Sequence, residues 1–343
     1  MWNTIISSGK KKGYIIKLMN KYLNRNYYET DDAFYRKKAN IDCWEQMQYQ
    51  SLRDYNIDYW LVFCNSINIE IQQAKDQLFI KPHNLAYNKN LFEYHLVTTN
   101  PRLAGESINS ILSMKKFVIF QTAFDFLKTY SWYRTTEPYT RFSHNAMIIG
   151  EDEQYYFYVD SPPMRNIKYF IPYHENASVG CIDKQELQHS FQYHCRIGYI
   201  EINENFLNHI SDILMILKGI KSTYFDNQEN DIKIGRSALL AFKNTLKNKI
   251  ALEFLLTDSF VFDLIASRHS ILKICIEKYC ALIKNLNYNE YIHILDALIF
   301  KWRIIEKLSI KYTLTRDFYI SEKIANLIEY DVIPLTDRFI QII

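Results

Sequence analysis

The pattern of apolar residues changes near residue 203, and this change constrains the fold most. Before it, short apolar runs and turn signals alternate, which is typical of mixed helices and strands. After it, five segments have apolar residues every three or four positions: 204–221, 234–257, 260–285, 289–310 and 319–343. This spacing predicts helices. We therefore predict an α+β chain, with a mixed domain over 1–202 and an all-α helical domain over 203–343.

The first part contains both kinds of element. Helices are predicted over 42–55, 106–114 and 184–191. Strands are predicted over 61–71, 92–98, 116–122, 165–171 and 195–202.

Two apolar runs on either side of Gly150–Gln154 predict a β-hairpin over residues 144–160. A turn centred on Asp152 would place His144 directly opposite Asp160. Directly opposed residues share one face of a sheet, with Cβ atoms about 4.5–5.5 Å apart. A carboxylate at that distance can orient an imidazole, which is part of a nucleophilic catalytic triad.

Among the six cysteines, Cys43 has the setting of a nucleophile. Asp42 and Glu45 form a capping-box pattern that makes Cys43 the first residue of a helix. The unpaired N–H groups and the positive end of the helix dipole favour a thiolate there, whereas the two nearby acids oppose it. We predict a triad of Cys43, His144 and Asp160.

The order of a helix-start Cys followed by His and Asp is that of papain-like enzymes. The predicted fold of 1–202 is therefore papain-like (cysteine-protease-like). The backbone N–H of Cys43 and one side-chain donor would form the oxyanion hole, and Asn40 is the nearest candidate for that donor.

Other motifs do not indicate a metal, phosphate or nucleic-acid site. His189, His194 and Cys195 do not have the spacing of a metal site, so no metal is expected. The segment Gly9–Gly13 lacks the Gly-Lys-Ser/Thr sequence that ends a phosphate-binding loop. The chain has no nucleic-acid-binding motif, so we expect no nucleic-acid partner.

The formal net charge is +3, but residues 1–40 hold nine basic and three acidic side chains, a local +6. This segment could attract an acidic partner or be an ordinary solvated surface. No apolar run suits a secretory signal or a membrane span. We expect a cytoplasmic protein without a membrane partner, whose cysteines are reduced.

Three features together resemble a known family. They are Cys43 at a helix start, the block from His144 to Asp160, and a helical C-terminal part that contains Ile234–Phe242. This combination resembles the papain-like acyltransferases of butirosin biosynthesis, which join a papain-like domain to a helical domain. The content of Ile, Lys, Asn and Tyr is similar to that of a branch of this family that forms amides in closthioamide assembly.

The resemblance implies a cysteine-dependent acyltransferase of antibiotic biosynthesis. Cys43 would take an acyl group from the phosphopantetheine arm of an acidic acyl or peptidyl carrier protein, with no bound cofactor. His144 would move the protons and Asp160 would orient it. A small amine would then receive the acyl group as an amide. The family's oxyanion donor has no clear equivalent in this sequence, and neither Asp42 nor Glu45 matches a family pattern.

Two alternatives stay open from the sequence. A papain-like cysteine peptidase or amidase would use the same triad with water as acceptor. A non-catalytic interaction protein would simply pack Cys43 as a small apolar residue.

Overall fold

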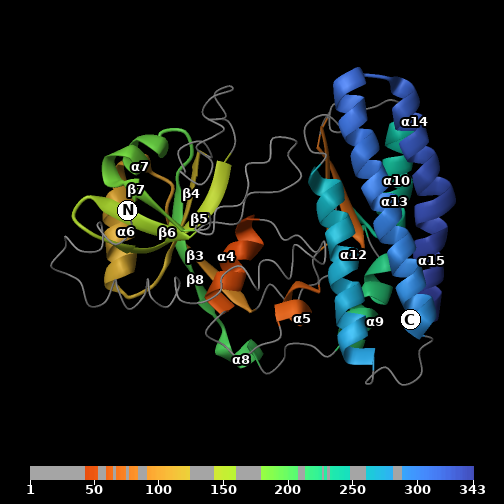
Figure 1. Cartoon of the computed structure of the whole chain (residues 1–343), viewed down its shortest axis with the longest axis horizontal. Helices are drawn as coiled ribbons and strands as arrows, with labels where there is room; N and C mark the ends of the chain where they lie inside the picture. Colours follow the sequence, from red (N-terminus) through yellow and green to blue (C-terminus); the bar gives the residue numbers. More distant parts are fainter. Residues whose placement is uncertain are drawn as a thin grey trace. The chain divides into compact units, whose positions relative to one another are not determined.

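The computed structural model describes about two thirds of the chain (Figure 1). The described residues are 43–52, 59–64, 67–74, 77–83, 91–123, 143–159, 179–207, 213–225, 228–229, 232–247, 260–280 and 288–343.

The described chain divides into two compact units. The first unit contains residues 42–56 and 92–203, and the second contains residues 57–91 and 204–343. The break at residue 203 coincides with the change in apolar spacing. The segment 57–91, however, lies within the predicted 1–202 domain and joins the second unit, because its strands pair with a strand near residue 233.

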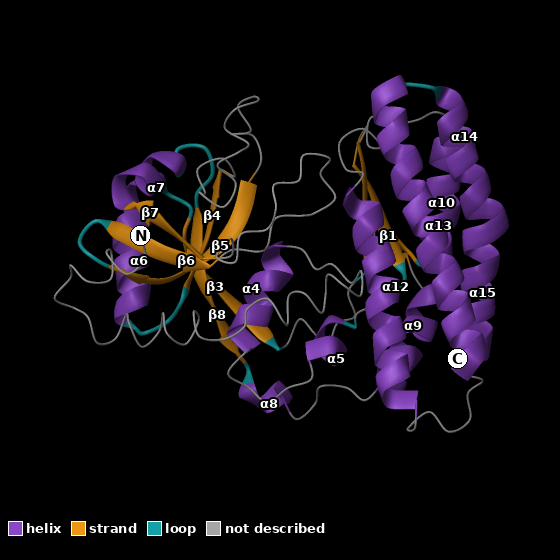
Figure 2. Cartoon of the chain, viewed as in Figure 1, coloured by secondary structure: helices purple, strands orange, loops and turns teal. Residues whose placement is uncertain are grey.

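The first unit is built on a six-stranded antiparallel sheet with strand order β3-β8-β4-β5-β6-β7 (Figure 2). The strands are β3 (Phe92–Thr98), β4 (Val118–Ala123), β5 (Ser143–Glu151), β6 (Tyr155–Val159), β7 (Val179–Asp183) and β8 (Arg196–Ile202). All but β7 were predicted at least in part, and β5 and β6 form the predicted hairpin. The strand predicted at 165–171 lies outside the described residues.

Helices cover both faces of this sheet. They are α4 (Cys43–Leu52), η2 (Pro101–Leu103), α6 (Ala104–Ser113) and α7 (Lys184–Ser190). The helices α6 and α7 pack on one face, where Ala146 and Ile148 of β5 join their core. The helix α4 packs against β5 and β8 on the other face. We call these the apolar face and the thiol face.

The core of the apolar face is aromatic. Phe120 is fully buried, and its ring meets Tyr158 and Phe191 edge-on, with centroids 6.3 and 6.4 Å apart. Such pairs add to the energy of area burial. This packing holds the end of α7 against β4 and β6.

The second unit contains a small antiparallel sheet, so the expectation of an all-α domain is wrong. Its strand order is β2-β1-β10-β9, with β1 (Ile69–Ala74), β2 (Gln77–Pro82), β9 (Gln228–Glu229) and β10 (Ile232–Ile234). Glu70 of β1 pairs with Ile234 of β10. The strands β9 and β10 are too short to produce a period in the sequence, and β10 joins the sheet by pairing with β1 from a distant segment.

The rest of this unit is helical, as predicted for its part after residue 203, and its longer helices stand side by side in Figure 1. The helices are α5 (Tyr59–Phe63), α8 (Glu204–Leu207), α9 (Ile213–Phe225), α10 (Arg236–Lys247), α12 (Phe260–Tyr279), α13 (Tyr288–Thr315), α14 (Phe318–Leu327) and α15 (Ile333–Ile342). Phe242, Phe262 and Trp302 stack in sequence between α10, α12 and α13, with centroids 5.7 and 6.2 Å apart.

A wide turn, η7 (Ile328–Val332), joins α14 to α15. The N–H of Ile333 donates to the carbonyl of Ile328, five residues earlier. Pro334 has no N–H and would clash with the carbonyl four residues before it. The wider π-type turn accommodates the proline without ending the helical segment.

One apolar run was assigned wrongly. Residues 61–71 were predicted as a strand, but Tyr59–Phe63 is the helix α5 and the strand β1 begins only at Ile69. Short buried apolar runs carry no period that separates helix from strand. Among the described helices, none is both long and apolar enough to cross a bilayer.

Candidate active site at the start of α4

Cys43 is the first residue of α4, as predicted, and its side chain is half-buried on the thiol face. The first N–H groups of a helix have no partner within the helix and point out of its N-terminal end. They favour negative charge at this position. Glu45, in the same first turn, is buried and acidic. The charges around the thiol are therefore mixed, as the sequence indicated.

Asn145 provides a side-chain contact to the thiol. Its amide Nδ2 donates to Sγ of Cys43 over 3.5 Å. Asn145 belongs to β5 and is half-buried, and α4 packs against that strand. An amide donor beside a sulfur stabilises the thiolate relative to the thiol, and it can also serve a developing oxyanion.

An aromatic pair continues the thiol face beside Cys43. The ring of Trp44, the next residue of α4, meets Tyr94 of β3 edge-on at 4.9 Å. The Arg196 guanidinium lies over the Tyr94 ring, with its central carbon 5.1 Å from the ring centroid. Burial raises the pKa of Tyr94, and the nearby Arg196 charge offsets part of the rise.

Gly198 makes room for the Tyr94 ring. A Cβ at Gly198 would lie 2.3 Å from the carbonyl oxygen of His95 and 2.8 Å from Cε2 of Tyr94. Real Cβ atoms do not approach backbone this closely, so only glycine fits beneath the ring. The register of β3 against β8 also shifts between Leu96 and Thr98, opposite this glycine.

His144 precedes Asn145 on β5 and is buried. Successive side chains on a strand point to opposite faces. Because Asn145 points to Cys43, His144 belongs to the apolar face with Ala146 and Ile148. Its partner across the ladder is Thr122, whose hydroxyl is hydrogen-bonded to Ser190 of α7.

The predicted hairpin is present, but its register is different. Met147 pairs with Val159 and Ile148 with Tyr158, so the centre of the hairpin lies near residue 153 and not at Asp152. The predicted register, which set His144 directly opposite Asp160, is therefore wrong over the described residues. The register also shifts within the hairpin, between Ile148 and Gly150. The turn is closed by Asp152, whose side chain accepts hydrogen bonds from the N–H groups of Gln154 and Tyr155. Asp160, Asp42 and Asn40 themselves lie outside the described residues, as does the basic segment 1–40.

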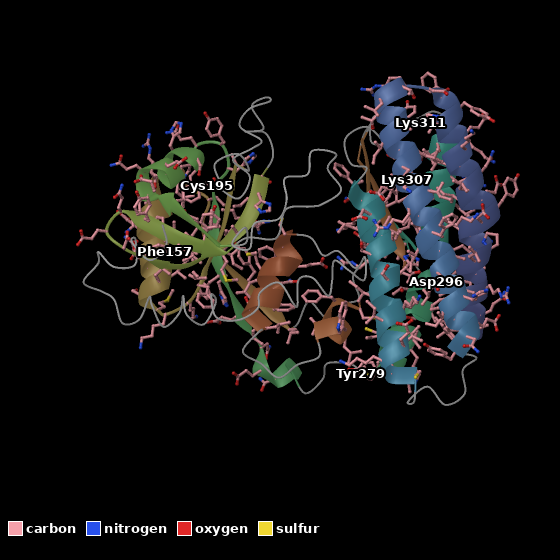
Figure 3. All side chains as sticks on the ribbon, viewed as in Figure 1. Phe157, Cys195, Tyr279, Asp296, Lys307 and Lys311 are labelled. Carbon is pink, nitrogen blue, oxygen red and sulfur yellow. The ribbon has the colours of Figure 1, made fainter. Side chains whose placement is uncertain are left out.

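Of the residues considered as metal ligands from the sequence, Cys195 and His189 lie in different surroundings. Burial raises the pKa of the Cys195 thiol, labelled in Figure 3, to about 11, so this thiol stays protonated at neutral pH. His189 lies on α7 and lines a surface cleft of about 440 Å³. The other residues of this cleft are Asn100, Pro101, Arg102, Gln185, Gln188 and Gln192.

A different group of possible ligands lies where β3 meets β8. Oxygen and nitrogen atoms of Glu93, His95 and Glu201 lie within 4.8 Å of one another. The Lys116 ammonium donates to Glu201, and this bond lowers the pKa of the Glu201 carboxyl. The ammonium also lies over the Tyr199 ring, 4.2 Å from its centroid. Lys116 thus already supplies positive charge to these two opposed acids.

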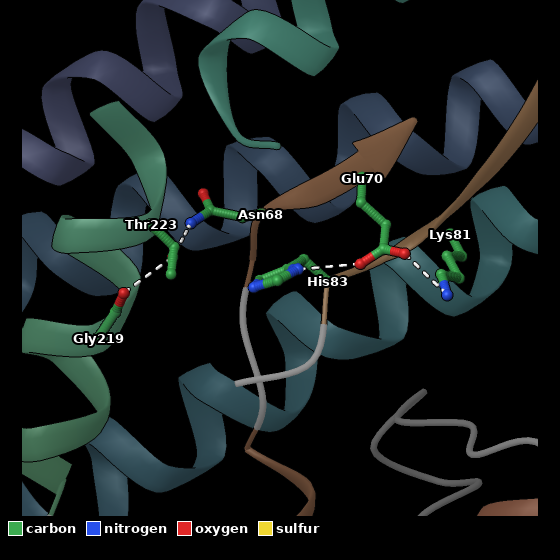
Figure 4. A network of polar contacts seen from close by, with 6 residues as sticks. All are labelled: Asn68, Glu70, Lys81, His83, Gly219 and Thr223. Atoms are coloured by element: carbon green, nitrogen blue, oxygen red, sulfur yellow. Dashed lines mark hydrogen bonds and ion pairs between the residues drawn. The ribbon is translucent and has the colours of Figure 1, made fainter. Parts of the chain in front are cut away.

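The second unit holds its own polar network (Figure 4). The carboxylate of Glu70 accepts from Lys81 at 2.7 Å and lies 2.9 Å from Nδ1 of His83. Burial alone would raise the pKa of Glu70, but the contacts with His83 and Lys81 outweigh it, so this pKa is lowered. Nearby, Asn68 donates to Thr223 at 2.7 Å, which joins β1 to α9. The network connects secondary structure elements of this unit.

No protein-family model matches the chain, and no curated protein is significantly similar to it. The roles of Cys43, His144, Asp160 and Asn40 therefore stay predictions. Asn145 is the residue that sequence reasoning missed. Its position was the available signal. Asn145 is a polar residue that directly follows His144 and precedes the apolar run 146–149 of the same strand.

Proposed function

We propose that this protein is a cysteine-dependent acyltransferase with a papain-like first unit. It would move an acyl group from a carrier-protein thioester, through an acyl-enzyme at Cys43, to an amine. The observation that supports it is the thiol of Cys43 at the start of a helix packed on a sheet, with the Asn145 amide 3.5 Å away. Helix-start thiols with nearby donors have the setting of reactive cysteines.

The proposed reaction has two displacements. The Cys43 thiolate attacks the thioester carbonyl, the bond to the pantetheine sulfur breaks, and that sulfur leaves with a proton from the His144 imidazolium. An amine then attacks the acyl-enzyme, gives its proton to His144, and the Cys43 thiolate leaves. The product is an amide, and the enzyme returns to its first state. Asp160 would orient the imidazole.

The oxyanion of each step needs two donors. One is the backbone N–H of Cys43, in the first turn of α4. We assign the second to the Asn145 side chain, because its amide already faces the thiol. Asn40, the candidate from the sequence, lies outside the described residues.

The carrier protein would be acidic and would meet the basic segment 1–40. The acceptor would be a small amine. Exclusion of water from the acyl-enzyme would decide between transfer and hydrolysis.

One observation favours a second candidate, a non-catalytic interaction protein. His144 belongs to the apolar face, whereas Cys43 lies on the thiol face. A buried histidine on the face opposite the thiol needs no catalytic role. In this candidate Cys43 is a packing residue and forms no covalent adduct.

Acylation of the full chain separates these candidates. The protein is incubated with neutral and anionic acyl pantetheine thioesters, and intact mass is measured. Native protein and Cys280→Ala, which removes an exposed thiol, should gain one acyl group, and Cys43→Ala should gain none. Absence of an adduct on the native protein with every thioester, carrier-bound thioesters included, would favour the interaction protein.

Addition of amines to the acylated protein then identifies the reaction. An amide product supports transfer, and free acid with every amine supports a peptidase or amidase. His144→Ala should abolish acylation near neutral pH if the imidazole moves the proton. Acylation at the native rate in this variant would remove His144 from the mechanism and leave the Cys43–Asn145 pair alone.

A further inference from the structure

Three polar residues form a row across the thiol face. Gln121 of β4 pairs with Asn145 of β5 on one side and with Arg196 of β8 on the other. Residues directly opposite each other in a ladder point to the same face. Adjacent strands lie about 4.8 Å apart, so the row spans roughly 10 Å.

The row begins at the candidate nucleophile. Asn145 donates to the Cys43 thiol, Gln121 is half-buried in the middle, and Arg196 is exposed at the other end. The helix α4 contacts β5 and β8, the two outer strands of the row. A group bound along the row would therefore have one end at the thiol and the other at the guanidinium.

Arg196 is held in place by aromatic contacts. Its guanidinium lies 5.1 Å from the centroid of Tyr94, which packs against Trp44. Gly198, on the same strand, leaves the space that the Tyr94 ring occupies. Within the described part of the chain, no carboxylate forms an ion pair with Arg196. Cation–π contact orients a guanidinium and leaves its N–H groups able to bind an anion.

We propose that Arg196 selects acyl groups that end in a carboxylate, with the thioester carbonyl at Cys43 and the chain along Gln121. A guanidinium binds a carboxylate through two parallel hydrogen bonds, which gives both geometry and charge recognition. The amide of Gln121 offers a donor and an acceptor to the middle of such a chain. This inference rests on the proposed function, because it names the substrate class of the same site.

The test compares two acyl groups of nearly equal shape. Glutaryl pantetheine thioester carries a terminal carboxylate, and its terminal amide analogue is neutral. The native protein should acylate at least tenfold faster with the glutaryl thioester. In Arg196→Gln the ratio should fall below about twofold, in Arg196→Lys it should be partly kept, and in Arg196→Glu it should reverse.

Arg102→Gln is the matched control, because Arg102 is also exposed but belongs to η2, away from the row. It should keep the native ratio. Equal rates with the two thioesters, or a preference unchanged in Arg196→Gln, would overturn the inference while the proposed function stands. Urea unfolding of each variant shows that the change is not a loss of folding.

A second measurement tests carboxylate binding at Arg196 without any acyl transfer. Free glutarate should slow alkylation of Cys43 by iodoacetamide in the native protein, and should have no effect in Arg196→Gln. If no thioester acylates the protein, the proposed function fails. Protection by glutarate would then still support an anion-binding row, and absence of protection would overturn it.

Discussion

The two faces of the six-stranded sheet are built from the same strands but differ in their polar content. On the apolar face, alternate residues such as Phe120, Ala146 and Ile148 are fully buried against α6 and α7. The thiol face also buries apolar residues such as Met147, but Gln121 and Asn145 there are polar and half-buried. At these polar positions we expect side chains to contribute less to stability than the buried rings of the apolar face. The predictions below test this division, from the largest expected effect to the smallest.

Removal of a ring from the apolar face should have the largest effect. Phe120→Ala leaves a cavity between Tyr158 and Phe191 and should lower the free energy of unfolding by about 3–5 kcal/mol. Gln121→Ala, the next residue on the same strand, should change it by less than about 1 kcal/mol. Urea unfolding measures both. Similar losses in the two variants would contradict the division.

Two glycines of the first unit, Gly198 and Gly105, should respond in opposite directions. Gly198→Ala places a methyl group against the His95 carbonyl and the Tyr94 ring, and should cost about 1–3 kcal/mol. Gly105→Ala lies in α6, where the new Cβ meets only Oε1 of Gln188 at 3.8 Å. It should stabilise the protein by about 0.5–1 kcal/mol. An unchanged free energy of unfolding in Gly198→Ala would show that Tyr94 can move from its place beside Arg196.

A tyrosine on the apolar face should make stability depend on alkaline pH. Burial, and then the charge of Glu151, raise the pKa of Tyr156 to about 12. The unfolded tyrosine ionises near pH 10, so this residue destabilises the fold as pH rises from about 10 to 12. The loss should reach about 2 kcal/mol. Tyr156→Phe should show a smaller loss over this range, and identical pH curves would rule the effect out.

The smallest effect concerns reactivity on the thiol face. Asn145→Ala should slow alkylation of Cys43 by iodoacetamide roughly two- to tenfold near neutral pH, because one hydrogen bond to the thiolate is lost. Asn109→Ala removes an amide that contacts Tyr156 on the apolar side and should leave the rate unchanged. Faster alkylation of Asn145→Ala would show that the amide shields the thiol and does not activate it.

Local signals in the sequence predicted many of the elements. The helix that begins at Cys43, the strands β3, β4 and β8, the β5–β6 hairpin and the long C-terminal helices have a clear period or turn pattern. The strands β1, β2, β9 and β10 were missed or misplaced. The strands β9 and β10 are very short, and the two local pairs β1–β2 and β9–β10 join into one sheet only where β1 pairs with β10, for example Glu70 with Ile234. That pairing joins residues more than 140 positions apart, which no local window contains.

The candidate site also combines features that local sequence determines with features that only tertiary packing determines. The sequence by itself determined that Cys43 begins a helix and that β5 and β6 form a hairpin, because capping and strand alternation are local. The tertiary structure decided which face of β5 the helix covers. That choice brought Asn145 to the thiol and placed His144 on the apolar face, since adjacent residues of a strand point to opposite sides. It also aligned Gln121 and Arg196 with Asn145, because register between strands is set by packing and turn geometry.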